Sequence, residues 1–509
     1  MFIKIFLLVL FFAVMLTVGF LCRRHAGSVS GFVLGGRNVG PWLTAFAYGT
    51  SYFSAVIFVG YAGQFGWKYG VSSTWIGIGN ALIGSLLAWV ILGGRTRAMT
   101  HHLQSSTMPE FFEKRFFSKA LKITASVIIF VFLIPYTASL YNGLSRLFGM
   151  AFNIDYTWCV IGMAVLTGIY VIVGGYMATA VNDFIQGLIM LGGIVAVVIA
   201  VLNVKGGFVE AMAELSKFSV QTASGSTQFG AYTSLFGPAP LSLLGVVILT
   251  SLGTWGLPQM IGKFYAIKDT AAIRKGTIIS TVFALIVAGG CYFLGGFVRL
   301  FSTEADLAAG GYDSLVPNML NGMPDILIAV VVILVLSASM STLSSLVLTS
   351  SSTITLDFIA PLFRKKIGER KQLLVMRLFI VFFIVISAAI AIVQAKSNVT
   401  FIAQLMGISW GALAGAFLAP FLYGLYFKKT TRAAVWVSFI SGTGLMIANM
   451  ICNFSGKVFI NEYFTSPINA GMLVMVLELI IVPLVSLLTP KGDGKRIDDI
   501  FSCYTKENK

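Results

Sequence analysis

Residues 45–66 read AFAYGTSYFSAVIFVGYAGQFG, an apolar segment long enough to cross a membrane but interrupted by Gly49, Gly60, Gly63 and Gly66. Such glycines suit a helix that packs closely against a neighbouring helix. They equally suit a broken helix, in which unwound backbone carbonyls face a cavity and bind a cation or a solute. The residues of this segment alone leave both interpretations open.

The composition is that of an integral membrane protein. The chain has 509 residues, of which 57% are hydrophobic and only 11% are charged, and its mean hydropathy is +0.90. A soluble domain has about 25% charged residues. The sequence leaves no stretch for a large soluble domain, and its five scattered cysteines indicate neither a disulfide framework nor a zinc site.

Apolar runs separated by charged or turn-rich breaks predict thirteen membrane-spanning helices and an all-α fold. The first run is too long for a signal peptide and is followed by Arg23 and Arg24, so we expect it to be retained as a helix. The predicted spans cover residues 2–22, 41–66, 73–94, 120–147, 156–175, 177–204, 238–260, 276–300, 325–355, 373–395, 400–427, 433–453 and 467–489.

The positions of the basic residues predict the orientation of the chain. Most of the 35 Lys and Arg residues lie in alternate connections, after spans 1, 3, 7, 9 and 11, and in the tail. Cytoplasmic loops carry such an excess. We therefore expect the N-terminus outside and the C-terminus in the cytoplasm of a cell inner membrane or plasma membrane. Topology explains the net charge of +16 without a nucleic-acid partner.

The seventh predicted span contains a second interruption. It reads TSLGTWGLPQM from Thr250, and Gly253, Gly256 and Pro258 lie close together. Proline removes an amide donor and frees a carbonyl one turn earlier, which lipid does not tolerate. Two interrupted spans five helices apart are typical of an inverted five-helix repeat, here spans 2–6 and 7–11, at residues 41–204 and 238–427.

Two acidic residues, Asp183 and Glu478, and one run of hydroxyls lie at membrane depth. Asp183 falls about one turn inside the sixth span, and a buried carboxylate marks an ion or proton path by default. Residues 337–357 read SASMSTLSSLVLTSSSTITLD at the end of the ninth span. Ala338, Ser341, Thr342 and Ser345 follow the spacing of one helix face. Hydroxyl oxygens suit hard cations, although the same residues also suit close helix packing.

At this point the chain resembles the sodium:solute symporter family, most closely its sodium/proline branch. The resemblance covers nearly the whole chain. Its matching stretches are FVLGGRNVGPWLTAFAYGTSYFSA near the start, GGYMATAVNDFIQ at Gly174, PQMIGKFYAIKDTAAIRKG at Pro258 and the hydroxyl run at Ser337. The resemblance implies a leucine-transporter-type core with one extra helix before it and two after it.

The resemblance also implies two sodium sites. The first joins the broken second span to the ninth. The second occurs in some members and uses an acid of the sixth span, so that two sodium ions per solute are possible here. The implied ligands are the backbone carbonyls of Thr50, Phe53 and Ala338 with the hydroxyls of Ser341 and Thr342 for the first site, and Asp183, Ser341, Thr342, Ser344 and Ser345 for the second.

The substrate side departs from the proline branch. Tyr52 stands where proline-type members have an aspartate, and Thr250 and Thr254 stand where they have Trp and Tyr. Tyr136 matches, and Trp255 is shifted. We find no basic residue at the membrane midplane to pair with a carboxylate. The expected solute-binding residues are the neutral set Tyr52, Ser54, Tyr136, Thr250, Thr254 and Trp255.

The prediction is a sodium-coupled symporter, functional as a monomer, that imports a small polar solute such as proline. Residues 1–489 form one transmembrane transporter domain and residues 490–509 a cytoplasmic tail. We expect no enzyme chemistry and no cofactor besides Na⁺ as the coupling ion. Proton coupling through Asp183 and a transporter-like solute sensor stay as alternatives, although the short tail carries no signalling pattern.

Overall fold

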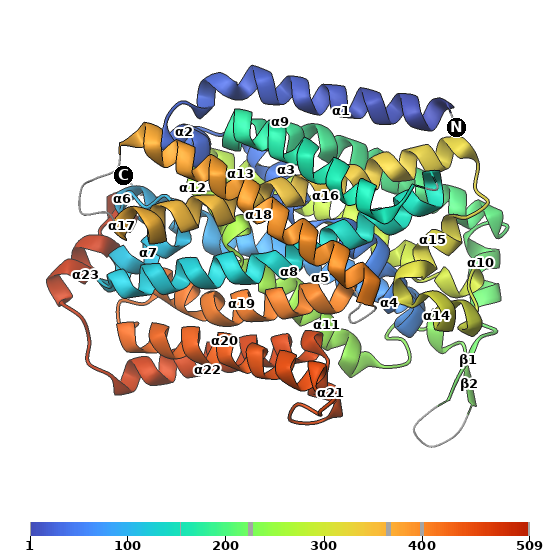
Figure 1. Cartoon of the computed structure of the whole chain (residues 1–509). Coiled ribbons are helices and arrows are strands. Elements are labelled where there is room, and N and C mark those ends of the chain that lie inside the picture. The colour runs from blue at the N-terminus through green and yellow to red at the C-terminus, as the bar shows by residue number, and fades with distance from the viewer. Residues whose placement is uncertain (1, 153, 222–226, 363–367, 398–401, 507–509) are drawn as a thin grey trace.

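The computed structural model describes residues 2–152, 154–221, 227–362, 368–397 and 402–506. Within them the fold is helical apart from one hairpin, in which β1 (Ser219–Gln221) pairs antiparallel with β2 (Thr227–Phe229). The long helices run side by side across the molecule (Figure 1). The prediction of an all-α membrane protein is confirmed.

Ten described helices are long and apolar enough to cross a membrane, or eleven if one bent pair counts as a span. The predicted count of thirteen is therefore not confirmed. It is larger because two continuous helical runs, Val56–His102 and Tyr156–Val204, each include parts of two predicted spans. The remaining long helices are α1 (Phe2–Cys22), α8 (Lys119–Phe152), α13 (Thr270–Gly295), α16 (Asp325–Thr353), α18 (Glu369–Ser397), α19 (Ile402–Tyr426), α20 (Arg432–Phe454) and α22 (Pro467–Leu488). Residues 400 and 401 of the predicted eleventh span lie outside the described residues.

The helix α9 (Tyr156–Val204) turns sharply at Gly175, whose φ of 55° and ψ of −146° are not helical. A straight helix of its 49 residues would be about 74 Å long, more than twice the roughly 30 Å hydrocarbon core of a bilayer. The turn at Gly175 separates the fifth from the sixth predicted span within this one element.

The second predicted span is broken, in agreement with the broken-helix interpretation of its glycines. Helix α3 (Pro41–Tyr52) ends before Phe53, which has extended backbone angles. Helical structure resumes with a π-helical turn at Val56–Tyr61 and with α4 (Ala62–Tyr69). The break lies at Phe53 and Ser54, N-terminal to most of the glycines that suggested it.

The seventh predicted span is also broken. Helix α11 (Pro240–Leu252) continues through a 3-10 turn at Gly253–Gly256, and α12 (Pro258–Ala266) follows after Leu257, which is extended. The two parts meet at 47°. Pro258 occupies the first turn of α12, where its missing N–H costs nothing.

The two ends of the helical bundle carry different elements. The start of α1 lies at the end that holds the β-hairpin, α10 (Phe208–Leu215), α14 (Glu304–Gly310) and α15 (Leu315–Leu320) (Figure 1). The opposite end holds α2 (Val29–Leu34), α6 (Gly94–His102), α7 (Met108–Phe116), α17 (Ala360–Leu362) and α23 (Gly494–Phe501). Three short helices complete the fold: α5 (Thr74–Gly79), α21 (Glu462–Thr465) and α24 (Cys503–Lys506).

The tail after α22 folds back onto the bundle. Lys428 pairs with Asp498 of α23 at 2.6 Å, and the Tyr504 hydroxyl donates to the Leu425 carbonyl at 2.9 Å. The segment predicted as a tail is therefore docked against α19 and the loop that follows it over its described residues.

Candidate ion and solute site

The five residues expected to form the first ion site meet in the structure. The Thr342 hydroxyl oxygen lies 3.2 Å from the carbonyl oxygens of both Thr50 and Phe53, and 3.0 Å from that of Ala338. The Ser341 hydroxyl oxygen lies 3.1 Å from the carbonyls of Thr50 and Ala338. All five residues are buried. The hydroxyl face of α16 thus lies against the broken end of α3.

The break in α3 makes these carbonyls available. In a continuous helix the Ile57 amide would donate to the Phe53 carbonyl, but here it donates to Ser54 at 3.0 Å. The Phe53 carbonyl instead faces Thr342. An unwound carbonyl at membrane depth is tolerated only where such a partner replaces the helical amide.

The cluster holds more acceptors than donors. It has three carbonyl oxygens and two hydroxyls, and each hydroxyl supplies a single hydrogen. Two hydrogens cannot satisfy all the acceptor positions at once. Neutral oxygens in this excess suit a hard cation, and the lack of a carboxylate in the set favours a monovalent one.

The residues expected for a second ion site are arranged differently. The Ser344 hydroxyl donates to the Ser341 carbonyl of its own helix at 2.9 Å. The Ser345 hydroxyl oxygen lies 2.8 Å from that of Ser51, a residue that the sequence interpretation did not include. Asp183 is fully buried, and its nearest cation is the Lys263 ammonium, 3.8 Å from Oδ2.

Lys263 is a buried basic residue beside this site that the sequence interpretation did not include. We placed the end of the seventh span at residue 260, which assigned Lys263 to a cytoplasmic connection. The structure instead extends α12 to Ala266, and Lys263 is 3% exposed. Its ammonium donates to Ser345 at 3.0 Å. The helix-starting position of Pro258 was the available signal, because it predicts that a helix continues beyond residue 260.

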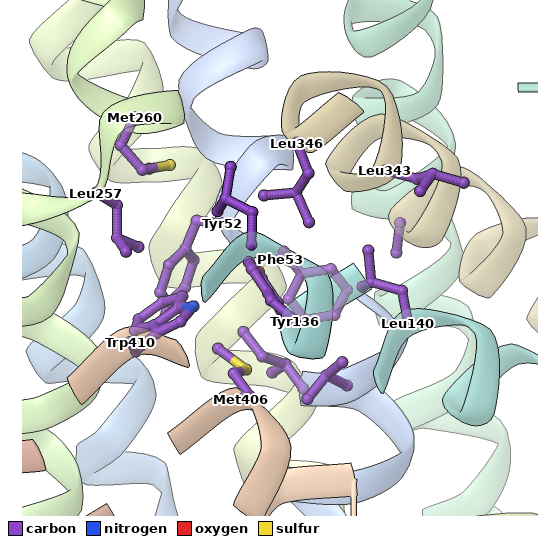
Figure 2. Close-up of a cluster of buried hydrophobic side chains, with 14 of the residues drawn as sticks. Tyr52, Phe53, Tyr136, Leu140, Leu257, Met260, Leu343, Leu346, Met406 and Trp410 are labelled. Carbon is purple, nitrogen blue, oxygen red and sulfur yellow. The ribbon is translucent and has the colours of Figure 1, made fainter. Parts of the chain in front are cut away.

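A buried aromatic cluster lies beside the break in α3 (Figure 2). The ring centroids of Tyr52 and Trp410 are 5.7 Å apart, and those of Tyr136 and Trp410 are 6.0 Å apart and edge-on. The Tyr136 hydroxyl faces Ser54 and Trp410. Among the described residues, the polar side-chain atoms of Tyr52, Ser54, Tyr136 and Trp410 make no hydrogen bond of ordinary geometry. This cluster therefore offers apolar rings together with several unused polar groups.

Trp410 was not among the predicted site residues. It lies on α19 between Ser409 and Gly411, in a run of small residues within an apolar span. Gly253 at the break of the seventh span approaches it, because a Cβ built there would lie 3.4 Å from the Trp410 ring. A large aromatic residue among glycines and alanines was the signal that could have identified it.

The predicted residues of the seventh span separate into two groups. Thr250 faces the Tyr52 hydroxyl, although its own hydroxyl donates to Val246 at 2.9 Å. Thr254 donates to the carbonyls of Ser251 and Gly84. The Trp255 indole donates to the Ile83 carbonyl at 3.0 Å. Thr254 and Trp255 therefore donate to backbone carbonyls and not to the aromatic cluster.

A pocket connects the α2 and α7 end of the bundle with Lys263. Its lining comes from α2, α7, α9, α12 and α16, and includes Met108, Tyr176, Gln259, Lys263 and Ser345. Of the residues predicted for the second ion site, Ser345 lines this pocket together with Lys263.

Comparisons with known proteins agree with the resemblance noted in the sequence. A family model described as the sodium:solute symporter family matches residues 32–442. A protein of Staphylococcus saprophyticus called sodium/proline symporter 2 is 29% identical over 470 residues, which cover 90% of this chain and 88% of that protein. A sodium/proline symporter of Staphylococcus aureus is 29% identical over 497 residues, which cover 95% and 92% of the two chains.

One solved structure has the same fold over almost the entire length. It is the substrate-bound, outward-open state of a Na⁺-coupled sialic acid symporter, with a TM-score of 0.75 over 97% of this chain and 99% of that one. At 16% sequence identity the likeness concerns the fold alone.

Proposed function

The chain belongs to the sodium:solute symporter family, and on that premise we propose that it imports a small polar organic solute together with sodium by alternating access. The observation that carries this proposal is the oxygen cluster between α3 and α16. Each of its two hydroxyls lies within 3.2 Å of at least two of the three carbonyls, where a broken helix meets an intact one. Sodium bound there links the two helices, so that ion binding stabilises one arrangement of the bundle.

The membrane potential supplies the driving force. One sodium ion that moves inward across 100 mV releases about 2.3 kcal/mol, and 1.4 kcal/mol corresponds to a tenfold concentration ratio. One ion therefore concentrates a neutral solute roughly 40-fold. No covalent chemistry and no cofactor besides sodium are needed for this cycle.

The proposed solute is a zwitterionic amino acid or a compound of similar size and polarity, with proline as the first candidate. The relatives named sodium/proline symporters support proline. We assign Tyr52, Ser54, Tyr136, Thr250 and Trp410, which lie beside the break in α3, to the solute-binding pocket. Their neutral polar groups suit a solute without net charge. We assign Thr254 and Trp255 to the walls that hold this pocket in place.

The proposed setting is the cell inner membrane or plasma membrane, with the N-terminus outside, the tail in the cytoplasm and a monomer as the working unit. The start of α1 and the helix α23 lie at opposite ends of the bundle, which supports termini on opposite sides of the membrane (Figure 1).

A two-step screen tests the function. The purified protein is heated with amino acids, sugars, osmolytes and carboxylates, each with sodium or with potassium. Compounds that raise the melting temperature only with sodium are then tested for uptake into proteoliposomes. We expect accumulation under an inward sodium gradient and none when potassium replaces sodium. Uptake driven by a proton gradient without sodium would contradict the proposal and favour proton coupling.

A further inference from the structure

Lys263 and Asp183 form a buried pair of opposite charge inside the second predicted ion site. The ammonium nitrogen lies 3.8 Å from Asp183 Oδ2, and the two side chains are 4% and 0% exposed. The pair joins α12, the second half of the broken seventh span, to α9. Both side chains are almost completely buried, so each compensates the charge of the other.

The ammonium is held from three sides. It donates to the Ser345 hydroxyl at 3.0 Å, and it lies 5.3 Å from the centre of the Tyr176 ring. The Ser51 hydroxyl donates to the Ala47 carbonyl at 2.5 Å, so the hydrogen in the 2.8 Å contact between Ser51 and Ser345 comes from Ser345. Ser345 thus accepts from Lys263 while its own hydrogen is directed at Ser51, an orientation that stabilises a cation at the position of the lysine.

We infer that the Lys263 ammonium is the built-in cation of the Asp183 cluster and takes the place of a second sodium ion, so that one sodium ion accompanies each solute. This inference rests on the proposed function. It replaces the possibility of two sodium ions that the resemblance left open. Asp183 and Ser345, which would both bind the second ion, lie on either side of the lysine.

Electrostatics supports the exclusion of the second ion. Asp183 and Lys263 together carry no net charge, and a sodium ion added beside them would leave one uncompensated positive charge in a buried region. At an effective dielectric constant of 20, repulsion between the Lys263 ammonium and a sodium ion about 4 Å away weakens sodium binding roughly a thousandfold. The comparison is with the same site without the lysine. At physiological sodium concentrations such a site stays without sodium while Lys263 is in place.

A transporter in which Lys263 replaces the second sodium ion concentrates its solute less strongly than one that moves two sodium ions. With one ion the limit is roughly 40-fold per 100 mV, whereas a second ion would square it. Because the lysine is part of the chain, it compensates the charge of Asp183 without an ion that has to be taken up and released.

Equilibrium binding of ²²Na⁺ to the purified full-length protein in lipid nanodiscs tests the inference. We expect one bound ion per chain in the parent protein and in Lys263→Arg, which keeps the positive charge. Lys263→Gln removes the charge and leaves Asp183 uncompensated, so we expect one additional ion. Lys263→Gln combined with Asp183→Asn should return to the parent value.

Lys268→Gln is the matched control, because Lys268 lies five residues further along the chain, beyond the end of α12, and its side chain is 45% exposed. It should bind the parent number of ions. Two ions in the parent, or no gain in a folded Lys263→Gln protein, would overturn the inference. If Lys263→Gln does not fold, the parent count decides alone. A parent that binds no sodium while Lys263→Gln binds one would refute the proposed function and uphold the role of the lysine.

Discussion

Thr342 is the side chain that approaches the largest number of carbonyls in the proposed first sodium site. Its hydroxyl oxygen lies within 3.2 Å of Thr50, Phe53 and Ala338. Ser341 shares two of these carbonyls. The two residues contribute the oxygens of α16 side chains, whereas the others contribute backbone oxygens that a substitution does not remove.

We expect Thr342→Ala and Ser341→Ala each to raise the sodium concentration for half-maximal uptake roughly 10- to 100-fold, because a hydrogen bond or ligand contact to a charged group contributes about 1.5–3 kcal/mol. Sodium titration of uptake in proteoliposomes measures this change. Ser339→Ala is the control, since Ser339 is buried on the same helix but donates to its own helix at Val335. Equal effects of all three substitutions, or none, would place the sodium site elsewhere.

Trp410 provides a test of the proposed solute pocket that leaves the ion site intact. Its indole N–H makes no hydrogen bond of ordinary geometry to the described residues. Trp410→Phe keeps an aromatic ring but removes this donor. We expect the solute to bind roughly tenfold more weakly, in line with the loss of about 1.4 kcal/mol, while sodium alone binds as before.

Binding of the solute and of ²²Na⁺ to the purified protein separates the two effects. Trp158→Phe serves as the control, because Trp158 is 69% exposed on α9. A loss of sodium binding in Trp410→Phe without solute would show that this residue supports the ion site instead.

At the scale of elements, the turn of α9 depends on one glycine. Gly175 has a positive φ of 55°, and a Cβ at this position would lie 2.9 Å from the Phe32 carbonyl oxygen. Both the backbone conformation and the contact exclude a side chain. The same turn leads directly into Tyr176, whose ring lies over the Lys263 ammonium.

We expect Gly175→Ala to lower the free energy of unfolding by about 1–3 kcal/mol, the cost of a strained backbone conformation. Thermal unfolding of the purified protein detects it as a lower melting temperature. Gly192→Ala, on the same helix with open space around it, should leave the melting temperature unchanged or raise it slightly. Matching melting temperatures for the two variants would show that the turn tolerates a side chain.

The breaks of the second and seventh spans have different causes: local sequence determines the position of one, and packing against another helix stabilises the other. Pro258 starts α12, so the position of the second break follows from the sequence. The first break lies at Phe53 and Ser54, where no proline and no glycine forces it. It is stabilised by α16, because the Thr342 hydroxyl donates to the Phe53 carbonyl that the break leaves without a helical amide.

At the scale of the whole molecule, the bundle has one basic end. Arg115 of α7 is buried there and donates to the carbonyls of Gly424 and Phe427. Burial lowers its pKa to about 10, so the guanidinium remains charged at neutral pH. Arg95 lies 4.0 Å from the centre of the Tyr426 ring and 4.6 Å from that of Tyr504. The contact between Arg95 and Tyr504 fastens the tail to the end that we assign to the cytoplasm.

Cysteine labelling tests this orientation. In a variant without the native cysteines, we expect Lys457→Cys to react with a membrane-impermeant maleimide in intact cells, and Lys495→Cys to react only after the membrane is permeabilised. Both positions are exposed, so access to the reagent and not burial decides the result. The reverse pattern would invert the proposed topology.

The sequence by itself determined the membrane class, the family, the interruption of the seventh span and the hydroxyl face of residues 338–345. Each of these depends on residues close together in the chain, where helical spacing, proline geometry and apolar length act directly. The partners across the bundle were decided only by the tertiary structure. Lys263 meets Asp183 and Trp410 meets Tyr52 because helices from distant parts of the chain pack together. A lysine at the end of an apolar run has the same local sequence signal whether it enters water or turns inward. Only the packing of α12 against α9 and α16 provides the carboxylate and the hydroxyl that make the inward position stable.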